Sequence, residues 1–248
     1  LFTRGSALAV VYILLNVLDR YDIFLAGRFY GDLGAGLYAG VARISQSVHS
    51  IVMAGSMIFV SELIGVTDAE ARTRHIRLAI LGATLFLAPI CVATWFYDSF
   101  IVSLIFAPEY SAVARVMSVL GVGTCVQSLM TIVGFQVLVL QNQASAFARS
   151  LGVALIGGVA VTVLAGPRLG YLGIAGIAVF AKVVATGMVV VRSRGFLSPG
   201  IWDDVPRALG LALGLGAVFW MLREQPPLLA LGVGGLGYSV AALYLFRD

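Results

Sequence analysis

The chain has 248 residues, of which 60% are hydrophobic and only 11% are charged, and its mean hydropathy is +1.00. Soluble domains contain roughly 45–50% apolar residues, so this composition excludes a soluble globular fold. The net charge of +4 comes without a long basic run or interleaved aromatic residues, which argues against a nucleic-acid-binding protein. The composition predicts an integral membrane protein.

The apolar segments have the length of membrane-spanning helices, which need about 20 residues each. Transmembrane barrels would instead show alternating segments of about ten residues. The fold class predicted is therefore an all-α membrane protein, a polytopic helix bundle of about eight transmembrane helices. In chain order, these helices are expected over residues 6–27, 37–63, 78–97, 113–140, 150–166, 171–191, 207–222 and 228–246.

The first of these segments contains three charged residues, Asp19, Arg20 and Asp22. A charge at the bilayer centre costs roughly 2.5–3.5 kcal/mol on insertion scales, so such residues usually face a bundle interior, a water-filled cavity or each other. In one continuous helix, Asn16 would share a face with Asp19 and would pair with Arg20, and Asp19 and Asp22 would share a face. Two interpretations stay open. The two acids could carry protons for a coupled transporter, or they could simply neutralise Arg20.

The second segment places a cation at the start of a polar stripe. Arg43 is followed at helical spacing by Gln46, Ser47 and Ser50, with His49 beside them. Because a guanidinium matches phosphate oxygens in a bidentate way, this stripe could receive a phosphate group. An ion pair from Arg43 across the helix hairpin to one of the acids of the first segment is the alternative. For His49, a packed neutral ring competes with a proton relay.

Elsewhere the sequence supplies one more candidate cation, Lys182, in the sixth predicted segment, where a lone lysine needs a partner or a cavity. Cys91 and Cys125 lack disulfide or metal spacing, so we expect no metal site. We find no phosphate-binding loop, nucleophile elbow or zinc-protease motif. The sequence therefore predicts neither an enzyme nor a cofactor.

The basic residues also predict an orientation. With the amino terminus in the cytoplasm, nine of the sixteen lie on the cytoplasmic side, four lie outside, and Arg20, Arg43 and Lys182 lie within segments. The positive-inside rule then favours a cytoplasmic location for both ends of the chain.

Three stretches, taken together in their order and spacing, resemble one family. They are YDIFLAGRFYGDLGAGLYAGVARI (Tyr21 to Ile44), IFAPEYSAVARVMSVL (Ile105 to Leu120) and GPRLGYLGIAGIAVFAKVV (Gly166 to Val184). They look like the carboxy-terminal half of bacterial polysaccharide-biosynthesis proteins, the oligosaccharide-flippase branch of the MATE-like (MOP) exporter superfamily. The resemblance covers roughly residues 6 to 192.

The resemblance implies two similar helix bundles around a central cationic cavity in the bacterial inner membrane. The substrate would be an undecaprenyl-diphosphate-linked oligosaccharide, flipped from the cytoplasmic to the periplasmic leaflet with ion coupling, and glycosyltransferases or a polymerase would be partners. Residues 1–192 would form the carboxy-terminal lobe, and residues 193–248 a cytoplasmic linker with two accessory helices. The amino-terminal lobe would then be missing from this chain, which we expect to be a fragment.

Carried onto this sequence, the resemblance assigns three residue sets. The cavity cations facing diphosphate or sugar would be Arg20, Arg43 and Lys182, with Gln46, Ser47 and Asn16 as polar partners. Asp19, Asp22 and His49 would be coupling or pairing groups. The alternatives are export of a drug or of the peptidoglycan lipid precursor by the same fold, and a non-transporting scaffold for glycan assembly. An acidic cavity would favour a cationic drug, and the mid-membrane arginines Arg20 and Arg43 speak against it.

Overall fold

The structure is a computed structural model that describes residues 2–63, 66, 68–196 and 204–246, with only the backbone given for residues 2–5 and 69. Within this part of the chain all regular structure is helical, which confirms the predicted fold class. The elements are α1 (Phe2–Leu18), α2 (Tyr21–Leu63), α3 (Ala69–Ile105), the 3₁₀ segment η1 (Pro108–Val113), α4 (Ala114–Val133), the π-helical segment η2 (Gly134–Val139), α5 (Ala144–Ser193), α6 (Val205–Met221) and α7 (Pro227–Leu245).

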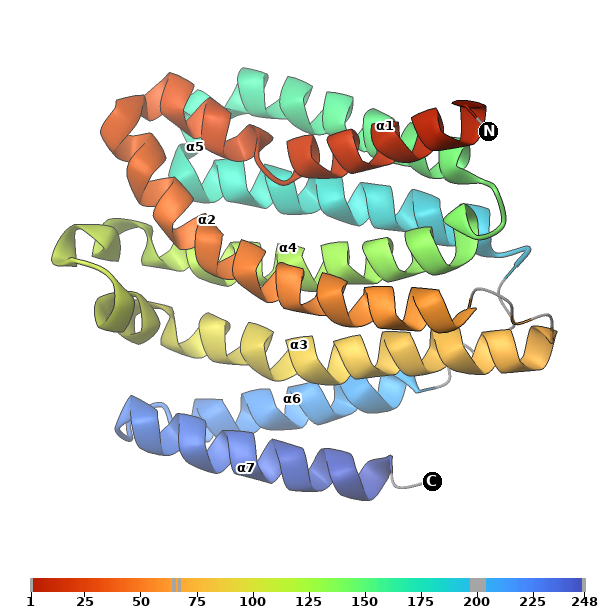
Figure 1. The fold of residues 1–248 in the computed structure, drawn as a ribbon. Coiled ribbons are helices and arrows are strands. Elements are labelled where there is room, and N and C mark those ends of the chain that lie inside the picture. The colour runs from red at the N-terminus through yellow and green to blue at the C-terminus, as the bar shows by residue number, and fades with distance from the viewer. Residues whose placement is uncertain (1, 64–65, 67, 197–203, 247–248) are drawn as a thin grey trace.

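Two of these helices reverse direction at a glycine, and each reversal separates two of the predicted spans. α2 turns at Gly31 (φ 71°, ψ −176°) and α5 at Gly170 (φ 69°, ψ −172°). Only glycine adopts this backbone region without strain. The two turns pack together, because the rings of Tyr30 and Tyr171 lie 4.4 Å apart and the Tyr30 hydroxyl donates to the carbonyl of Gly166. The chain thus forms two hairpins, visible at the left of Figure 1.

α4 lies at the centre of the bundle and is covered by α2, α3 and α5 (Figure 1). Two buried clusters surround it. One contains Val11, Phe147 and Leu151, and the other contains Tyr38 and Met117. Helices that pack so closely in a bilayer associate by van der Waals contact and interhelical hydrogen bonds, since lipid tails are as apolar as their side chains. α4 is therefore the frame against which the outer helices are positioned.

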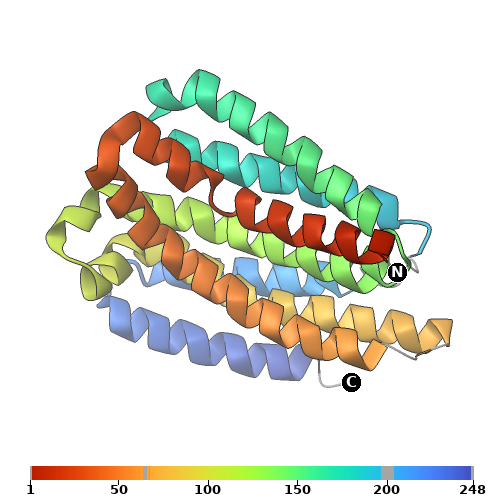
Figure 2. The same ribbon diagram turned by 45° about the horizontal axis from the view of Figure 1, so that its top comes forward.

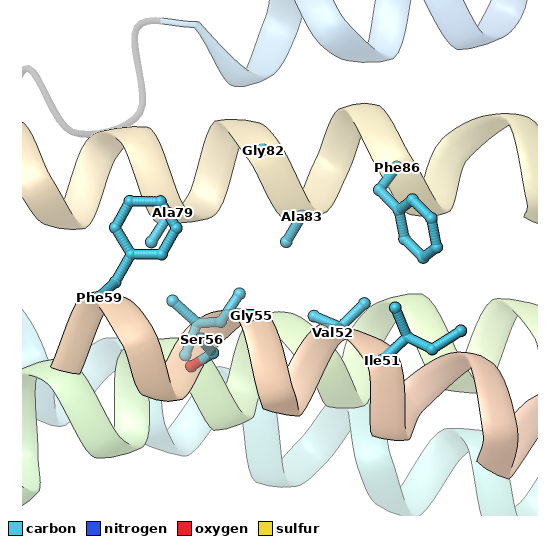
Figure 3. Close-up of a pocket in the computed structure, with 10 residues that line it drawn as sticks. Ile51, Val52, Gly55, Ser56, Phe59, Ala79, Gly82, Ala83 and Phe86 are labelled. Atoms are coloured by element: carbon cyan, nitrogen blue, oxygen red, sulfur yellow. The ribbon is translucent and has the colours of Figure 1, made fainter. Parts of the chain in front are cut away.

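α6 and α7 form a separate pair against the far side of α3 (Figure 2). Their shared core is Phe219 with Tyr97, Leu215, Ala230 and Tyr238. Large apolar side chains such as Leu213 (76% exposed) cover their outer faces, as expected of surfaces that contact lipid.

Four described helices are long and apolar enough to cross a membrane: Glu70–Ile105, Pro108–Val139, Ala144–Ser193 and Pro227–Leu245, with Val205–Met221 as a shorter apolar helix. A helix occupies most of each of the eight predicted segments, but a turn at Asp19 and Arg20 interrupts the first, and α3 begins at Ala69, nine residues before the predicted start. The first described residues of α1 and the last of α7 lie toward the same end of the bundle (Figure 1). This arrangement agrees with an even number of crossings, while the assignment of that end to the cytoplasm stays a prediction.

Candidate substrate site

The first predicted span is broken where its charges lie. α1 ends at Leu18, α2 begins at Tyr21, and Asp19 and Arg20 form a turn between them. The side-chain amide of Gln46 donates to the Asp19 carbonyl (3.2 Å), which satisfies an acceptor that the broken helix leaves free. The prediction of one continuous helix over 6–27 was therefore wrong, although Asp19 and Asp22 still line one common pocket.

An open cleft of about 450 Å³ lies between α1 and α2 at this break. Seven of the nine predicted site residues line it, and Asp22 and Lys182 do not. The lining is Tyr12, Leu15, Asn16, Asp19, Arg20, Arg43, Gln46, Ser47, His49, Ser50 and Met53. The predicted stripe that starts at Arg43 thus faces the charged turn across the cleft.

Three neutral residues of the cleft, Asn16, Ser47 and Ser50, donate hydrogen bonds within their own helices. The hydroxyls of Ser47 and Ser50 donate to the carbonyls of Arg43 (2.8 Å) and Gln46 (2.9 Å). The Asn16 amide donates to the Tyr12 carbonyl (2.8 Å) and not to a charged partner. The predicted pairing of Asn16 with Arg20 was therefore wrong.

Arg20 and Arg43 are the exception. Both are exposed in the cleft, and within the described part of the chain neither guanidinium has a hydrogen bond or an ion pair. The alternative of an ion pair from Arg43 to Asp19 or Asp22 was wrong, because these acids are bonded to other groups. Two arginines with all donors free, facing one polar cleft, form an anion-binding arrangement.

Lys182 lies behind this cleft, in a nearly closed pocket of about 10 Å³. Its ammonium bonds the Asp19 carboxylate at 3.0 Å, and the residue is only 7% exposed. Such a volume is about that of one water-sized sphere, so the pocket is too small for a substrate group. Lys182 therefore does not share the concave face of Arg20 and Arg43, contrary to the three-cation arrangement expected from the sequence.

Asp22 lies in the same closed pocket and is 4% exposed. Its carboxylate accepts from the Tyr38 hydroxyl (2.7 Å) and from the backbone N–H of Ile23 (3.0 Å). Tyr38 lies on the second arm of α2, so this bond ties the two arms of the hairpin together. The sequence analysis missed Tyr38, although its place in the Gly-Leu-Tyr-Ala stretch put it one turn before Ala42 and Arg43.

His49 joins the cleft to α4. Its Nδ1 lies 3.0 Å from the Ser128 hydroxyl, and its Nε2 lies 3.5 Å from the side-chain amide of Gln127. The ring lines both the open cleft and the closed pocket. It thus sits, with Asp19 and Gln46, in the wall between the two.

The comparisons with known proteins give one result. No protein-family model and no curated protein matches the chain. A solved structure does, "Lipid II flippase MurJ, inward closed conformation", with a TM-score of 0.79 over 94% of this chain and 13% sequence identity. The chain has the fold of a lipid flippase. It spans about half (52%) of the length of that protein.

At 13% identity this likeness shows the fold alone, and that fold agrees with the all-α membrane transporter fold expected from the sequence. It does not distinguish the oligosaccharide-flippase branch from others. The fold places α1 and α2, with their open polar cleft, among membrane-spanning helices, where a polar cleft needs a polar occupant or a polar cover.

Proposed function

We propose that the chain is one lobe of an ion-coupled flippase for an undecaprenyl-diphosphate-linked oligosaccharide, moved from the cytoplasmic to the periplasmic leaflet of the bacterial inner membrane. The observation that carries this proposal is the pair of unpartnered guanidinium groups of Arg20 and Arg43 in the cleft between α1 and α2. Their substrate would have to be an anion.

A diphosphate fits this pair by charge and by hydrogen-bond geometry. Each guanidinium presents a planar set of donors that matches two phosphate oxygens, and hydrogen bonds between ionised groups are roughly twice as strong as neutral ones. Leaving two arginines unpaired at membrane depth is costly, and a bound anion removes that cost. The side chains of Asn16, Ser47 and Ser50 already donate hydrogen bonds to backbone carbonyls of their own helices. The two arginines therefore supply the selectivity for a negatively charged substrate.

The cleft is also incomplete, as expected if a second lobe faces it. The chain spans 52% of the similar flippase structure, and the exposed residues Asn16, Arg20, Arg43, Ser47 and Ser50 all lie on the open side of the cleft. We infer that an opposing bundle closes this side to form a central cavity. Helices α6 and α7 lie on the far side of α3 from this cleft, which fits an accessory role.

The peptidoglycan lipid precursor is the second candidate substrate, and the name of the similar structure, a lipid II flippase, favours it. Both candidates are lipid-linked anions, so the cleft itself does not separate them. A cationic drug fits neither arginine, and a non-transporting scaffold would gain nothing from two inward-facing cations.

The test replaces Arg43 by Ala in the full-length protein and measures surface polysaccharide together with the lipid-linked oligosaccharide retained in the cytoplasmic leaflet. We expect loss of surface polysaccharide at normal protein levels, with partial activity in Arg43→Lys, because an ammonium supplies charge without the planar fork. Arg28→Ala, an exposed arginine outside the cleft, is the matched control.

Unchanged polysaccharide in Arg43→Ala would contradict the cleft as the substrate site. Normal polysaccharide with cell lysis and accumulated peptidoglycan precursor would instead assign the protein to the second substrate.

A further inference from the structure

Asp19 separates the two polar spaces of this lobe. Its carboxylate lines the open cleft with Arg20 and Arg43, and it also lines the closed pocket, where it bonds the Lys182 ammonium. The Asp19 side chain is 21% exposed and the Lys182 side chain 9% exposed, so the carboxylate covers the ammonium from the cleft side. Lys182 is thus one side chain away from the cleft in which a substrate anion would bind.

We propose that Asp19 is an internal stand-in for the substrate: it occupies the anion position at Lys182 in the empty transporter, and a substrate phosphate displaces it. Lys182 then becomes the third phosphate-binding cation. This inference rests on the proposed function and adds a step to it.

The backbone at Asp19 permits such an exchange. The residue lies in the turn between α1 and α2, so its side-chain direction is not fixed by a helix. Within the described residues its carboxylate has one partner, Lys182, at 3.0 Å. Lysine suits the exchange too, because its ammonium is a point charge on a flexible four-carbon stem.

Asp22 provides the contrast within the same pocket. Its carboxylate accepts from both Tyr38 and the N–H of Ile23 and is 4% exposed. We therefore expect Asp22 to stay in place while Asp19 moves. Asp22 thus remains as a second carboxylate in the pocket of Lys182 during the exchange.

The charge balance fits the same exchange. Arg20, Arg43 and Lys182 face Asp19 and Asp22 around the two spaces. With Asp19 withdrawn, the three cations and the Asp22 carboxylate leave an excess of two positive charges. A diphosphate diester carries two negative charges, so the site becomes neutral when the substrate is bound.

The first test measures binding of geranylgeranyl diphosphate to the full-length protein in nanodiscs at one fixed pH. Asp19→Asn removes the competing charge, and we expect its binding to be about tenfold tighter than that of the wild type, the equivalent of one charged hydrogen bond. In Asp19→Asn/Lys182→Met we expect that gain to disappear, because the third cation is gone. Asp32→Asn, an exposed acid at the Gly31 turn, should bind like the wild type.

A second measurement follows binding in the wild-type protein and uses a variant only to assign one resonance. Lys182 is the sole lysine of the sequence, so ¹⁵Nζ-lysine labelling with ³¹P recoupling in solid-state NMR reports on its ammonium. The resonance that is missing in Lys182→Met identifies it. We expect dephasing by ³¹P after geranylgeranyl diphosphate is added.

Each outcome separates this inference from the function it rests on. Two results would overturn the exchange and leave the proposed function standing. One is diphosphate binding that requires Arg43 but shows no ³¹P contact at Lys182. The other is an Asp19→Asn variant that folds and binds no tighter than the wild type. A wild-type protein that binds no polyprenyl diphosphate would overturn both.

Discussion

Two regions of the molecule are held together by different interactions. Charged side chains bond one another in the polar centre between α1, α2 and α5, whereas apolar side chains pack together in the pair formed by α6 and α7. At the centre, Lys182 and Asp22 are buried and Asp19 is half-buried, and these residues are bonded to one another or to Tyr38. In the α6–α7 pair the core contact with α3 is aromatic, with Phe219 set edge-on against Phe96 and Tyr97. The charges of this second region lie at its end, where Asp204 precedes α6.

The contrast between buried charges and apolar packing bears on which of the two regions we propose to bind substrate. A buried ion pair is often no more stabilising than well-packed apolar residues of the same volume, so its presence is poor evidence for stability. Close packing holds helices together in a bilayer, and α6 and α7 add to it a hydrogen bond from Tyr238 to the Leu85 carbonyl and the Arg77–Asp204 ion pair at the start of α6. We therefore attribute the charges at the centre to substrate handling, and the α6–α7 contact to stability.

The largest effect on stability is expected from breaking the pair at the centre. Lys182→Met leaves the Asp19 carboxylate partly buried without its partner, and we expect a loss of about 3 kcal/mol of unfolding free energy, since removing one member of a buried pair typically costs 3–5 kcal/mol. Reversible unfolding in detergent measures it.

The matched control for that variant is Thr186→Val, one turn further along α5. The Thr186 hydroxyl donates to the carbonyls of Lys182 and Val126, so the variant removes only neutral bonds, worth about 0.6 kcal/mol each in a membrane protein. Equal losses in the two variants would show that the charge at the centre has no special cost.

A smaller effect is expected in the apolar pair. Phe219 is 2% exposed, and Phe219→Ala removes its contacts with Phe96 and Tyr97. We expect a loss of about 2 kcal/mol, below the 3–5 kcal/mol of a soluble core, because separated membrane helices expose the ring to lipid instead of water and only the packing contribution is lost. Faster hydrogen exchange in α7 would report it.

Trp220→Ala is the control for that variant, because Trp220 is 58% exposed. We expect diphosphate binding to be unchanged in both. The Phe219→Ala protein could instead keep its fold and lose diphosphate binding as completely as Arg43→Ala. That result would contradict the assignment of substrate binding to the polar centre alone.

The smallest effect concerns the polar end of α6. Asp204 accepts from the Arg77 guanidinium (2.6 Å) and lies 3.6 Å from Arg207. The hydrogen bond from Arg77 holds the pKa of Asp204 below its ordinary value of 3.8. A lowered pKa in the folded state means that the stabilisation is complete above pH 3.8 and is lost as the pH falls through the lowered value.

The protection factor of the amides at the start of α6, which corrects the exchange rate for its chemical dependence on pH, should therefore fall in strong acid and stay constant from pH 5 to 8. Asp204→Asn should exchange faster at neutral pH and show no such acid step. An acid step that survives in Asp204→Asn would assign it to another group.

The sequence predicted the helices well because each is an apolar run long enough to span a bilayer, and the two glycine turns at Gly31 and Gly170 fell between predicted spans. The break at Asp19 and Arg20 was not predicted, because periodicity assumes a continuous helix. The sequence does carry a signal for this break, because three of the four residues from Asp19 to Asp22 are charged within an otherwise apolar run.

The partners within the site could not be predicted in the same way. Lys182 meets Asp19 across 163 residues, and His49 meets Ser128 across 79. Such pairings depend on how α4 and α5 pack against the hairpin of α2, which spacing along one helix does not contain. The cleft residues Arg43, Gln46 and Ser47 were grouped correctly because they share one helix face.

The most direct measurement of the central claim is an experimental structure of the full-length protein with geranylgeranyl diphosphate bound in a membrane mimetic. The account predicts diphosphate density in the cleft between α1 and α2, with phosphate oxygens hydrogen-bonded to both Arg20 and Arg43. Diphosphate density outside this cleft, with both guanidinium groups still unpartnered, would contradict it.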